Sequence, residues 1–453
     1  MSRTERIYAG AAGAAGPLLF LANCRRVALG EWVRIDIPGE PTRSGQVIDA
    51  SDALTLVQVL EDTVGLAPGR ATVMLTGDVA KAMVGRDLLG RVLNGLGRPL
   101  DGLPAPVGEA LLDVHGAPMN PARRMPPADI IETGVSAIDG LNTLVRGQKL
   151  PIFAGPGLPA LELGARIVEW ARVKGDEPFA VLFVALGITE RETRTFVQRF
   201  ESSDILQRSV IYLNQTRDPT IERLLAPRVA LAQAEYLAFS CGYRVLVVIA
   251  DMLHYCDALR EVAAAREEVP GRRGYPGYMY TDLASIFERA GIAQGCAGSV
   301  TQIPILTMPD DDITHPIPDL TGYITEGQVV LARELHRKDL FPPVDVLPSL
   351  SRLMNAAIRG GTFEGHRQWA NRLYAAYAQG REASLTAAIV GEAGLQESDR
   401  RAMAFADRFE REFVHQGDTR RRLEETETVG RRLLAWLDED DTKEPAHSAG
   451  AVA

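Results

Sequence analysis

Residues 150–163 of this chain read LPIFAGPGLPALEL and place a glycine-rich loop between an apolar run and a helix-like stretch. Loops of the type Gly-x4-Gly-Lys-Ser/Thr bind phosphates because small residues let backbone N–H groups surround them, while the lysine and the hydroxyl contact the terminal phosphates and Mg²⁺. If the pattern starts at Gly155, Leu161 occupies the lysine position and Glu162 the hydroxyl position. By itself, an ordinary turn between strand and helix explains such a loop better than phosphate binding does.

Two acidic positions could assist phosphate chemistry at a loop of this kind. Asp251 ends the apolar run 245–250, where proteins with phosphate-binding loops place an aspartate that orients Mg²⁺. Glu190 and Glu192 follow the apolar run 179–186, where a glutamate could polarise an attacking water. The structural interpretation is favoured for both, because any buried strand can end in aspartate and acidic side chains stabilise helix N-termini.

Composition and charge limit the class of protein. Of the 453 residues, 46% are hydrophobic and 24% are charged, and no stretch approaches the ~20 apolar residues of a membrane-spanning helix, so we expect a soluble protein. The net charge of −10 argues against nucleic acid as a partner. The cysteines are too scattered for a zinc site or a disulfide framework, which predicts no metal site and a reducing cytoplasm; they are Cys24, Cys241, Cys256 and Cys296.

Three hydrophobic patterns follow one another along the chain and define the elements that must position these residues. Residues 1–75 contain short alternating segments separated by turns, which predict a small N-terminal β-barrel or sandwich. From 76 to 345, apolar strand-like runs alternate with amphipathic helices, the pattern of an α/β domain with a parallel sheet and, here, a degenerate phosphate-binding loop.

Residues 346–437 are predicted to form a C-terminal helical domain. Apolar residues recur there at four-residue steps, and we expect these stripes in the core and not at a ligand; they are Trp369, Leu373 and Tyr377, then Phe405, Phe409 and Phe413. Residues 438–453 are acidic, then small and polar, and are predicted to be a disordered tail.

Several long blocks of the sequence resemble the B subunit, the non-catalytic partner, of V/A-type rotary ATPases. The blocks are Leu88–Gly102, Glu267–Ala284, Thr301–Gln328, Phe341–Asn355 and Phe405–Gly417. Within the fourth block, PPVDVLPSLS matches a signature shared by the paired subunits of rotary ATPases, Pro-small-aliphatic-Asp-x3-Ser-x-Ser, and an arginine follows it directly. The resemblance extends from about residue 15 to 417 and covers nearly the whole chain.

The resemblance implies an architecture and an assembly. The expected fold has an N-terminal β-barrel, a central RecA-like P-loop domain and a C-terminal helical domain. The expected assembly is a ring of three A and three B chains, in which ATP or ADP with Mg²⁺ lies at the interface and is bound mainly by the catalytic A subunit. This chain alone would bind no nucleotide tightly. Central and peripheral stalk subunits would link the ring to a membrane sector that translocates H⁺ or Na⁺, on the cytoplasmic face of the membrane.

The resemblance also assigns residues to the shared nucleotide site. Arg352 resembles an arginine finger, a guanidinium that reaches across the interface and stabilises the charge of the transferring phosphoryl group. Tyr323 and Ser351 would line the same site. The alternative interpretations are a surface ion pair for Arg352 and a packing role for Tyr323.

The resemblance extends to the altered loop, because these B subunits carry Gly-Leu-Pro in place of Gly-Lys-Thr. This chain has Gly157, Leu158 and Pro159 at that place. Ala160 and Leu161 then replace residues that are more often polar, which weakens the expectation of a nucleotide at this secondary site. The sequence therefore predicts a chain that keeps the fold and the finger while the neighbouring A subunit binds the phosphates.

Two other functions were weighed against this one. The first is an autonomous catalytic ATPase subunit with a variant loop, which the missing lysine and hydroxyl argue against. The second is a hexameric RNA-translocating ATPase of related core fold, which the acidic charge balance argues against.

Overall fold

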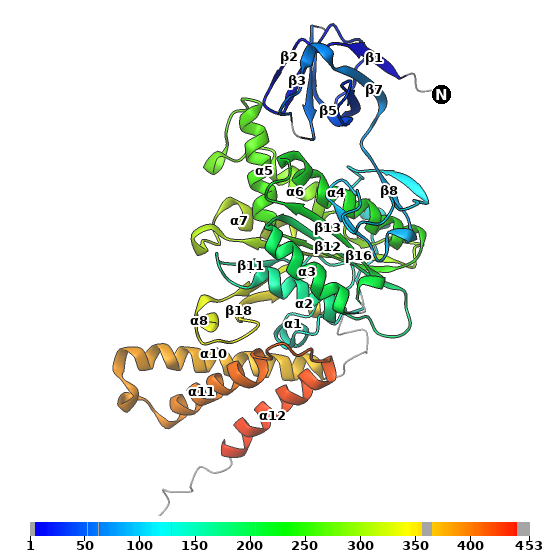
Figure 1. Ribbon diagram of the computed structural model, residues 1–453. Coiled ribbons are helices and arrows are strands. Elements are labelled where there is room, and N and C mark those ends of the chain that lie inside the picture. Colours follow the sequence, from blue (N-terminus) through cyan, green and yellow to red (C-terminus); the bar gives the residue numbers. More distant parts are fainter. Residues whose placement is uncertain are drawn as a thin grey trace, which may run out of the picture. The chain divides into compact units, whose positions relative to one another are not determined.

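The structure is a computed structural model that describes residues 5–441, apart from 52, 62, 128, 204 and 356–364 (Figure 1). The chain forms two compact units, one comprising Met1–Asn120 and Ala180–Arg289, the other Pro121–Phe179 and Ala290–Ala453. In the part of the chain that is described, no helix combines the length and the apolar character needed to cross a membrane.

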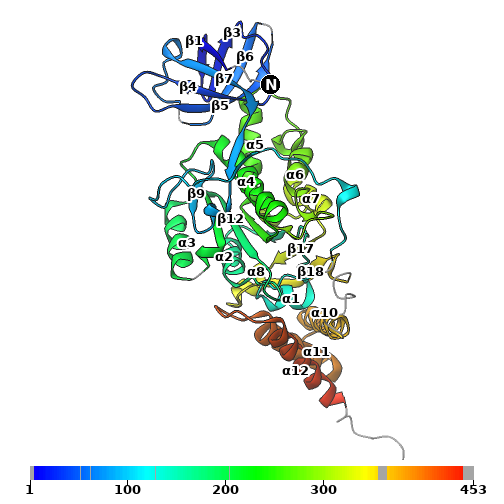
Figure 2. The same ribbon diagram turned by 90° about the vertical axis from the view of Figure 1, so that its right-hand side faces the viewer.

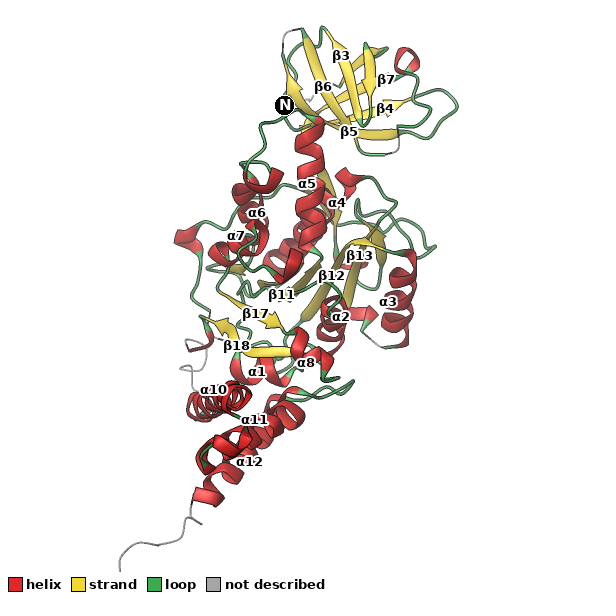
Figure 3. Cartoon of the chain, turned by 90° about the vertical axis from the view of Figure 1, so that its left-hand side faces the viewer, coloured by secondary structure: helices red, strands yellow, loops and turns green. Residues whose placement is uncertain are grey.

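The N-terminal region of the first unit is a half-barrel of antiparallel strands (Figure 3). The hydrogen-bonded order is β1-β7-β4-β5-β6-β3-β2. The strands are β1 (Arg6–Ala9), β2 (Gly13–Ala15), β3 (Leu18–Ala22), β4 (Glu31–Asp36), β5 (Arg43–Ala50), β6 (Leu54–Val59) and β7 (Thr72–Val79). The strand-rich N-terminus is confirmed, and β7 continues past the predicted limit at residue 75.

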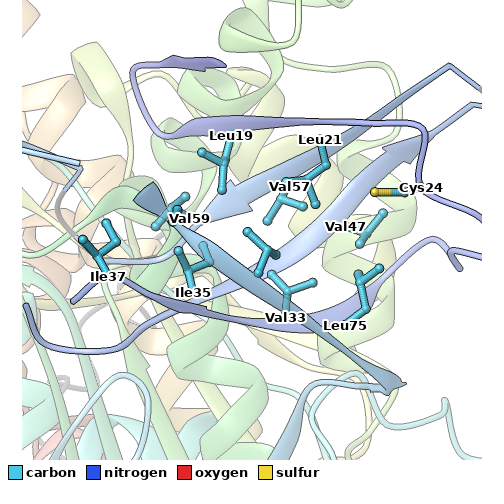
Figure 4. Packing of buried hydrophobic residues seen from close by; sticks show 12 residues of the cluster. Leu19, Leu21, Cys24, Val33, Ile35, Ile37, Val47, Val57, Val59 and Leu75 are labelled. Carbon is cyan, nitrogen blue, oxygen red and sulfur yellow. The ribbon is translucent and has the colours of Figure 1, made fainter. Parts of the chain in front are cut away.

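Alternating apolar residues build the core of the half-barrel, as the two-residue period of a strand requires. Along β4, Val33 and Ile35 are fully buried while Arg34 between them is exposed. The side chains of Leu19, Val57 and neighbouring apolar residues gather with them between the strands (Figure 4).

The remainder of the first unit contains strands in the hydrogen-bonded order β14-β12-β13-β9, of which β12, β13 and β9 run parallel. These strands are β9 (Val92–Asn94), β12 (Phe179–Ile188), β13 (Ser209–Gln215) and β14 (Arg244–Ala250). The helices here are α3 (Glu190–Ser202), α4 (Thr220–Glu235), α5 (Met252–Ala265) and α6 (Met279–Phe287), and a separate antiparallel pair is formed by β8 (Lys81–Val84) and β10 (Ala110–Asp113).

The second unit contributes central strands in the order β18-β17-β11-β16. These are β11 (Ile152–Ala154), β16 (Ser299–Thr307), β17 (Gly327–Leu331) and β18 (Val344–Ser351), with β15 (Gly291–Ile292) beside β16. The helices are α1 (Ser136–Leu141), α2 (Ala160–Trp170), α7 (Pro316–Ile324) and α8 (Arg333–Arg337).

The predicted parallel sheet is mixed in this unit. β11 is parallel to β16 and β17, whereas β18 is antiparallel to β17 and β15 is antiparallel to β16. β18 also passes the predicted domain limit at residue 345. The strand is hard to recognise from the sequence because Pro348 and two serines interrupt its apolar residues, a composition that suits a strand at the edge of a sheet.

Helices make up the C-terminal region, where α10 (His366–Val390), α11 (Glu397–Arg408) and α12 (Leu423–Asp441) pack together (Figure 2). A π-helical segment, Phe409–Val414, follows α11. Both predicted stripes are buried, with at most 2% of each side chain exposed. The predicted tail begins differently, because residues 438–441 belong to α12; residues 442–453 lie outside the described residues.

A buried carboxylate in the first turn of α4 makes the stability of the first unit depend on pH. Glu222 is 6% exposed, and its Oε1 accepts a hydrogen bond from the N–H of Gly95 (2.9 Å). Burial, reinforced by the charge of nearby Asp218, raises the pKa of Glu222 from 4.5 to about 7. Between these values the folded chain keeps a proton that the unfolded chain releases, so stability falls as pH rises.

Replacing this group by Glu222→Gln should remove that pH-dependent loss. We expect the variant to gain stability over the natural chain as pH rises from 5 to 8, by up to about 3 kcal/mol. Amide hydrogen-exchange protection of α4, corrected for the intrinsic pH dependence of exchange, would measure the difference across this range, with the exposed Glu261→Gln as the matched control. A difference between Glu222→Gln and the natural chain that stays constant with pH would contradict the assignment.

Candidate functional site

The glycine-rich loop connects β11 to α2, as the sequence predicts. Gly157 has φ of +79°, a left-handed conformation that favours glycine. Pro159 is the N-cap residue of α2 and makes no side-chain capping bond. The local frame of a phosphate-binding loop, strand to glycine turn to helix, is therefore present.

The loop nevertheless has few N–H donors to offer to a phosphate. Pro156 and Pro159 have none. The N–H of Leu158 donates to the carbonyl of Gly155 (3.2 Å), and the N–H of Ala160 donates to the carbonyl of Leu158 (2.8 Å). Phosphate binding by such loops depends on converging backbone N–H groups, so this conformation is poorly suited to it.

An acidic side chain from another loop packs directly against the start of this one. A Cβ atom added to Gly155 would overlap Oδ1 of Asp311. Arg333, the first residue of α8, donates through Nε and Nη2 to the Asp311 carboxylate (3.0 and 2.9 Å) and through Nη2 to the carbonyl of Pro156 (2.9 Å). The hydrogen bond from Arg333 lowers the pKa of Asp311, so the carboxylate beside the loop stays ionised.

The two positions that replace lysine and hydroxyl add nothing that favours a triphosphate. Leu161 is partly buried in the first turn of α2. The side chain of Glu162 is 52% exposed, and its Oε1 lies 3.0 Å from Nη2 of Arg166. With two carboxylates near the loop and no lysine, these residues do not fit a Mg²⁺-triphosphate.

Arg352 lies directly after β18 and has an anchored backbone and an exposed side chain. Its N–H donates to the carbonyl of Glu326 (3.0 Å). Within the described residues, the guanidinium forms no ion pair or hydrogen bond. The surface ion pair considered from the sequence is therefore not seen among the described residues.

Tyr323 and Ser351 have contrasting environments. Tyr323, near the end of α7, is 73% exposed, which does not suit a packing residue. Ser351 is 5% exposed, and its hydroxyl donates to the carbonyl of Thr143 (2.9 Å) and accepts from Nε2 of Gln148 (3.0 Å). The Ser351 hydroxyl is thus engaged within the chain, whereas the Tyr323 ring is available at the surface.

The glycine-rich loop and Arg352 lie at opposite ends of the strands. β11 is parallel to β17, with Phe153 paired to Val330, while β18 is antiparallel to β17, with Ser351 paired to Gly327. The loop leaves the carboxyl end of β11, and Arg352 therefore lies beyond the amino ends of β11 and β17. At about 3.3 Å per residue, the length of β17 separates the two features by about 15 Å along the strands.

The acidic positions of the first unit have structural roles. Asp251 is the N-cap residue of α5, and its carboxylate accepts from the N–H of Leu253 (2.8 Å). Thr189 and Glu192 form a capping box at the start of α3, and Glu190 pairs with Arg194. Across the described part of the chain, no group of three or more histidine, cysteine, aspartate or glutamate side chains could hold a metal ion.

Sequence reasoning did not find three of the residues that shape these sites: Asp311, Arg333 and Gln148. Asp311 and Arg333 are 22 residues apart, and nothing in their spacing indicates that they meet over Gly155. Asp311 does lie within the family-like block 301–328, and that membership was the one available signal.

Comparison with known proteins places this geometry in a family. Residues 134–351 match the model of the "ATP synthase alpha/beta family, nucleotide-binding domain", and residues 355–446 match the "C-terminal domain of V and A type ATP synthase". The V-type ATP synthase beta chain of Anaeromyxobacter sp. (strain K) is 60% identical over 444 residues, which cover 96% of this chain and 93% of that protein.

Two further relatives agree. The V-type ATP synthase beta chain of Thermus thermophilus is 53% identical over 98% of this chain and 95% of its own length. The solved ATP synthase subunit NeqB from Nanoarcheaum equitans is 37% identical and superposes with a TM-score of 0.73, covering 93% of this chain and 99% of that one. The chain therefore belongs to the V-type ATP synthase beta chain family, the B subunits of V/A-type ATPases.

Proposed function

We propose that this chain is the non-catalytic B subunit of the head of a V/A-type rotary ATPase, and that Arg352 acts in trans on a nucleotide bound by a neighbouring A subunit. The observation that carries the proposal is that Arg352 lies at the opposite end of the strands from the glycine-rich loop. A guanidinium about 15 Å from the loop along the strands does not serve a phosphate held there. An exposed guanidinium with an anchored backbone suits a nucleotide held by another chain.

The condition of the loop supports the non-catalytic assignment. Its prolines and its internal hydrogen bonds leave few N–H donors, and Arg333, the cation beside the loop, is already paired with the carboxylate of Asp311. ATP or ADP with Mg²⁺ is then held by the A subunit at the shared interface. Tyr323 contributes its exposed ring to that interface. Ser351 contributes by holding the chain next to Arg352, and not through its hydroxyl, which is engaged within the chain.

The proposed assembly is an alternating ring of three A and three B chains. Central and peripheral stalk subunits connect the ring to a membrane sector that translocates H⁺ or Na⁺, with the head on the cytoplasmic face. Arg333, at the loop, is followed by Glu334, whose carboxylate binds Nη1 and Nη2 of Arg381 in α10 (2.9 and 2.8 Å). α8 thus gives a direct mechanical connection between the loop region and the C-terminal helices that would act on the central stalk.

Reconstitution with the A chain of the same genome tests this function. We expect the isolated chain to show no Mg²⁺-dependent ATP hydrolysis, and the mixture to form an alternating hexamer that hydrolyses ATP. Native mass spectrometry would give the stoichiometry and a coupled assay the turnover. Sustained hydrolysis by this chain alone would instead support the autonomous catalytic ATPase.

The RNA-translocating alternative gains no support from the comparisons. The relatives described above, which match nearly the whole chain, are V-type ATP synthase beta chains. A salt-sensitive RNA mobility shift by this chain alone would revive that alternative.

A further inference from the structure

A buried amide lies beneath the backbone from which Arg352 projects. Gln148, in the connection between α1 and β11, is fully buried. Its Nε2 donates to the carbonyl of Glu326 (3.1 Å) and to Oγ of Ser351 (3.0 Å). The same Glu326 carbonyl accepts from the N–H of Arg352 (3.0 Å). One side chain therefore connects the residue before the arginine with the carbonyl that holds the arginine backbone.

The other end of this amide is also fixed. Oε1 of Gln148 accepts from the N–H of Val145 (2.8 Å), which sets the orientation of the amide group. The hydroxyl of Ser351 donates onward to the carbonyl of Thr143 (2.9 Å). Because each hydrogen bond constrains the next, the end of β18 is held against the 143–148 segment.

A partly buried ion pair also holds the Glu326 side chain. The side chain of Lys149 is 3% exposed, and its Nζ lies 2.8 Å from Oε1 of Glu326. The backbone N–H of Lys149 donates to the second oxygen, Oε2 (2.9 Å). Both carboxylate oxygens of Glu326 are thus engaged, which fixes the residue whose carbonyl is shared by Gln148 and Arg352.

We propose that Gln148 is a positioning residue for Arg352. The inference rests on the proposed function, in which Arg352 stabilises charge on the nucleotide of a neighbouring subunit. The guanidinium itself has no partner among the described residues, so its placement depends on the backbone at 351–352. A group acting on a transition state has to be held to within about 0.5 Å. Gln148 contributes to that placement by fixing the backbone from which the Arg352 side chain starts, through the Glu326 carbonyl and the Ser351 hydroxyl.

The test is Gln148→Leu in the complex reconstituted with the A chain. We expect kcat for ATP hydrolysis to fall about 100-fold, since a misplacement of about 1 Å can cost that much, while KM for MgATP changes little. Trapping of MgADP with fluoroaluminate, which mimics the transferring phosphoryl group, should fall in parallel, whereas MgADP binding alone should be retained. A change confined to KM, or no change in kcat, would overturn the proposal.

Gln416→Leu is the matched control for loss of a buried amide. Gln416 is 6% exposed and lies in the same unit, where Nε2 donates to the carbonyls of Gly134 and Thr419 (2.8 Å each) and Oε1 accepts from the N–H of Ser136 (2.9 Å). None of these hydrogen bonds involves Arg352. We expect its kcat to stay near that of the natural complex, and equal losses in the two variants would reduce Gln148 to a stabilising residue.

A double variant separates positioning from general destabilisation. If Gln148 acts only through Arg352, Gln148→Leu should not slow a complex that already carries Arg352→Ala, and an additive loss would overturn the proposal. Should Gln148→Leu fail to assemble, Ser351→Ala removes one acceptor of the same amide, and we expect a kcat loss of about tenfold at unchanged KM. If Arg352→Ala alone has no effect, the proposed function fails; if it does and Gln148→Leu does not, only the positioning role fails.

Discussion

Replacing Arg352 with alanine is expected to lower ATP turnover by the assembled complex by about 10³-fold or more. An arginine finger stabilises negative charge that develops in the transition state, so its loss acts on kcat much more than on nucleotide binding. The exposed side chain has no partner among the described residues, so its removal should leave this chain folded and able to assemble. Steady-state ATPase kinetics and native mass spectrometry of the same preparation would measure both properties.

Two further variants sharpen this test. Arg352→Lys keeps the charge but loses the planar fork of donors, and we expect it to recover only a small part of the activity. Arg337→Ala removes another exposed arginine of the same unit. Arg337 lies at the C-terminal end of α8, at the same end of the strands as the glycine-rich loop, and its loss should leave turnover nearly unchanged. Unimpaired hydrolysis in Arg352→Ala complexes would rule out the finger.

The glycine-rich loop shows which structural features local sequence patterns can predict. Its strand, its glycine turn and its helix were predictable because glycine, proline and apolar runs determine local backbone structure. The loss of N–H donors follows partly from the sequence, since Pro156 and Pro159 are visible there. The pairing of Asp311 with Arg333 was not predictable, because a tertiary contact between separate loops leaves no periodic pattern.

Around Arg352, too, some features were predictable from the sequence and others were not. The sequence placed the arginine after a signature segment, yet that segment was not recognised as strand β18, because its proline and serines obscure the alternation of buried residues. Ser351 was assigned to the nucleotide interface by the family resemblance, whereas its hydroxyl is used inside the chain. Burial of Gln148 depends on three separate segments meeting, which no single-segment pattern contains.

The aromatic stripes were the most predictable part of the fold, and Phe409→Ala is the variant expected to destabilise it most. Phe409 is fully buried, with its ring 4.5 Å from that of Tyr377 and 5.1 Å from that of Phe413. Truncating a buried phenylalanine removes transfer free energy and leaves a cavity, which together cost about 3–5 kcal/mol. Amide hydrogen exchange of α10 and α11 should accelerate by about 100-fold or more, since about 1.4 kcal/mol corresponds to a factor of ten.

Hydrogen exchange suits this prediction because a chain of several domains does not unfold in one step, and the loss should stay local. The exposed Leu385→Ala on α10 is the control, and it should leave exchange nearly unchanged.

Phe409 precedes Glu410, whose buried carboxylate binds Nζ of Lys338 (2.7 Å) and the hydroxyl of Tyr377 (3.1 Å). The aromatic packing therefore also supports the contacts that join the end of α8 to the C-terminal helices. Faster exchange should extend to α8 in Phe409→Ala, and protection unchanged in both α8 and α10 would show that this ring is not what holds them together.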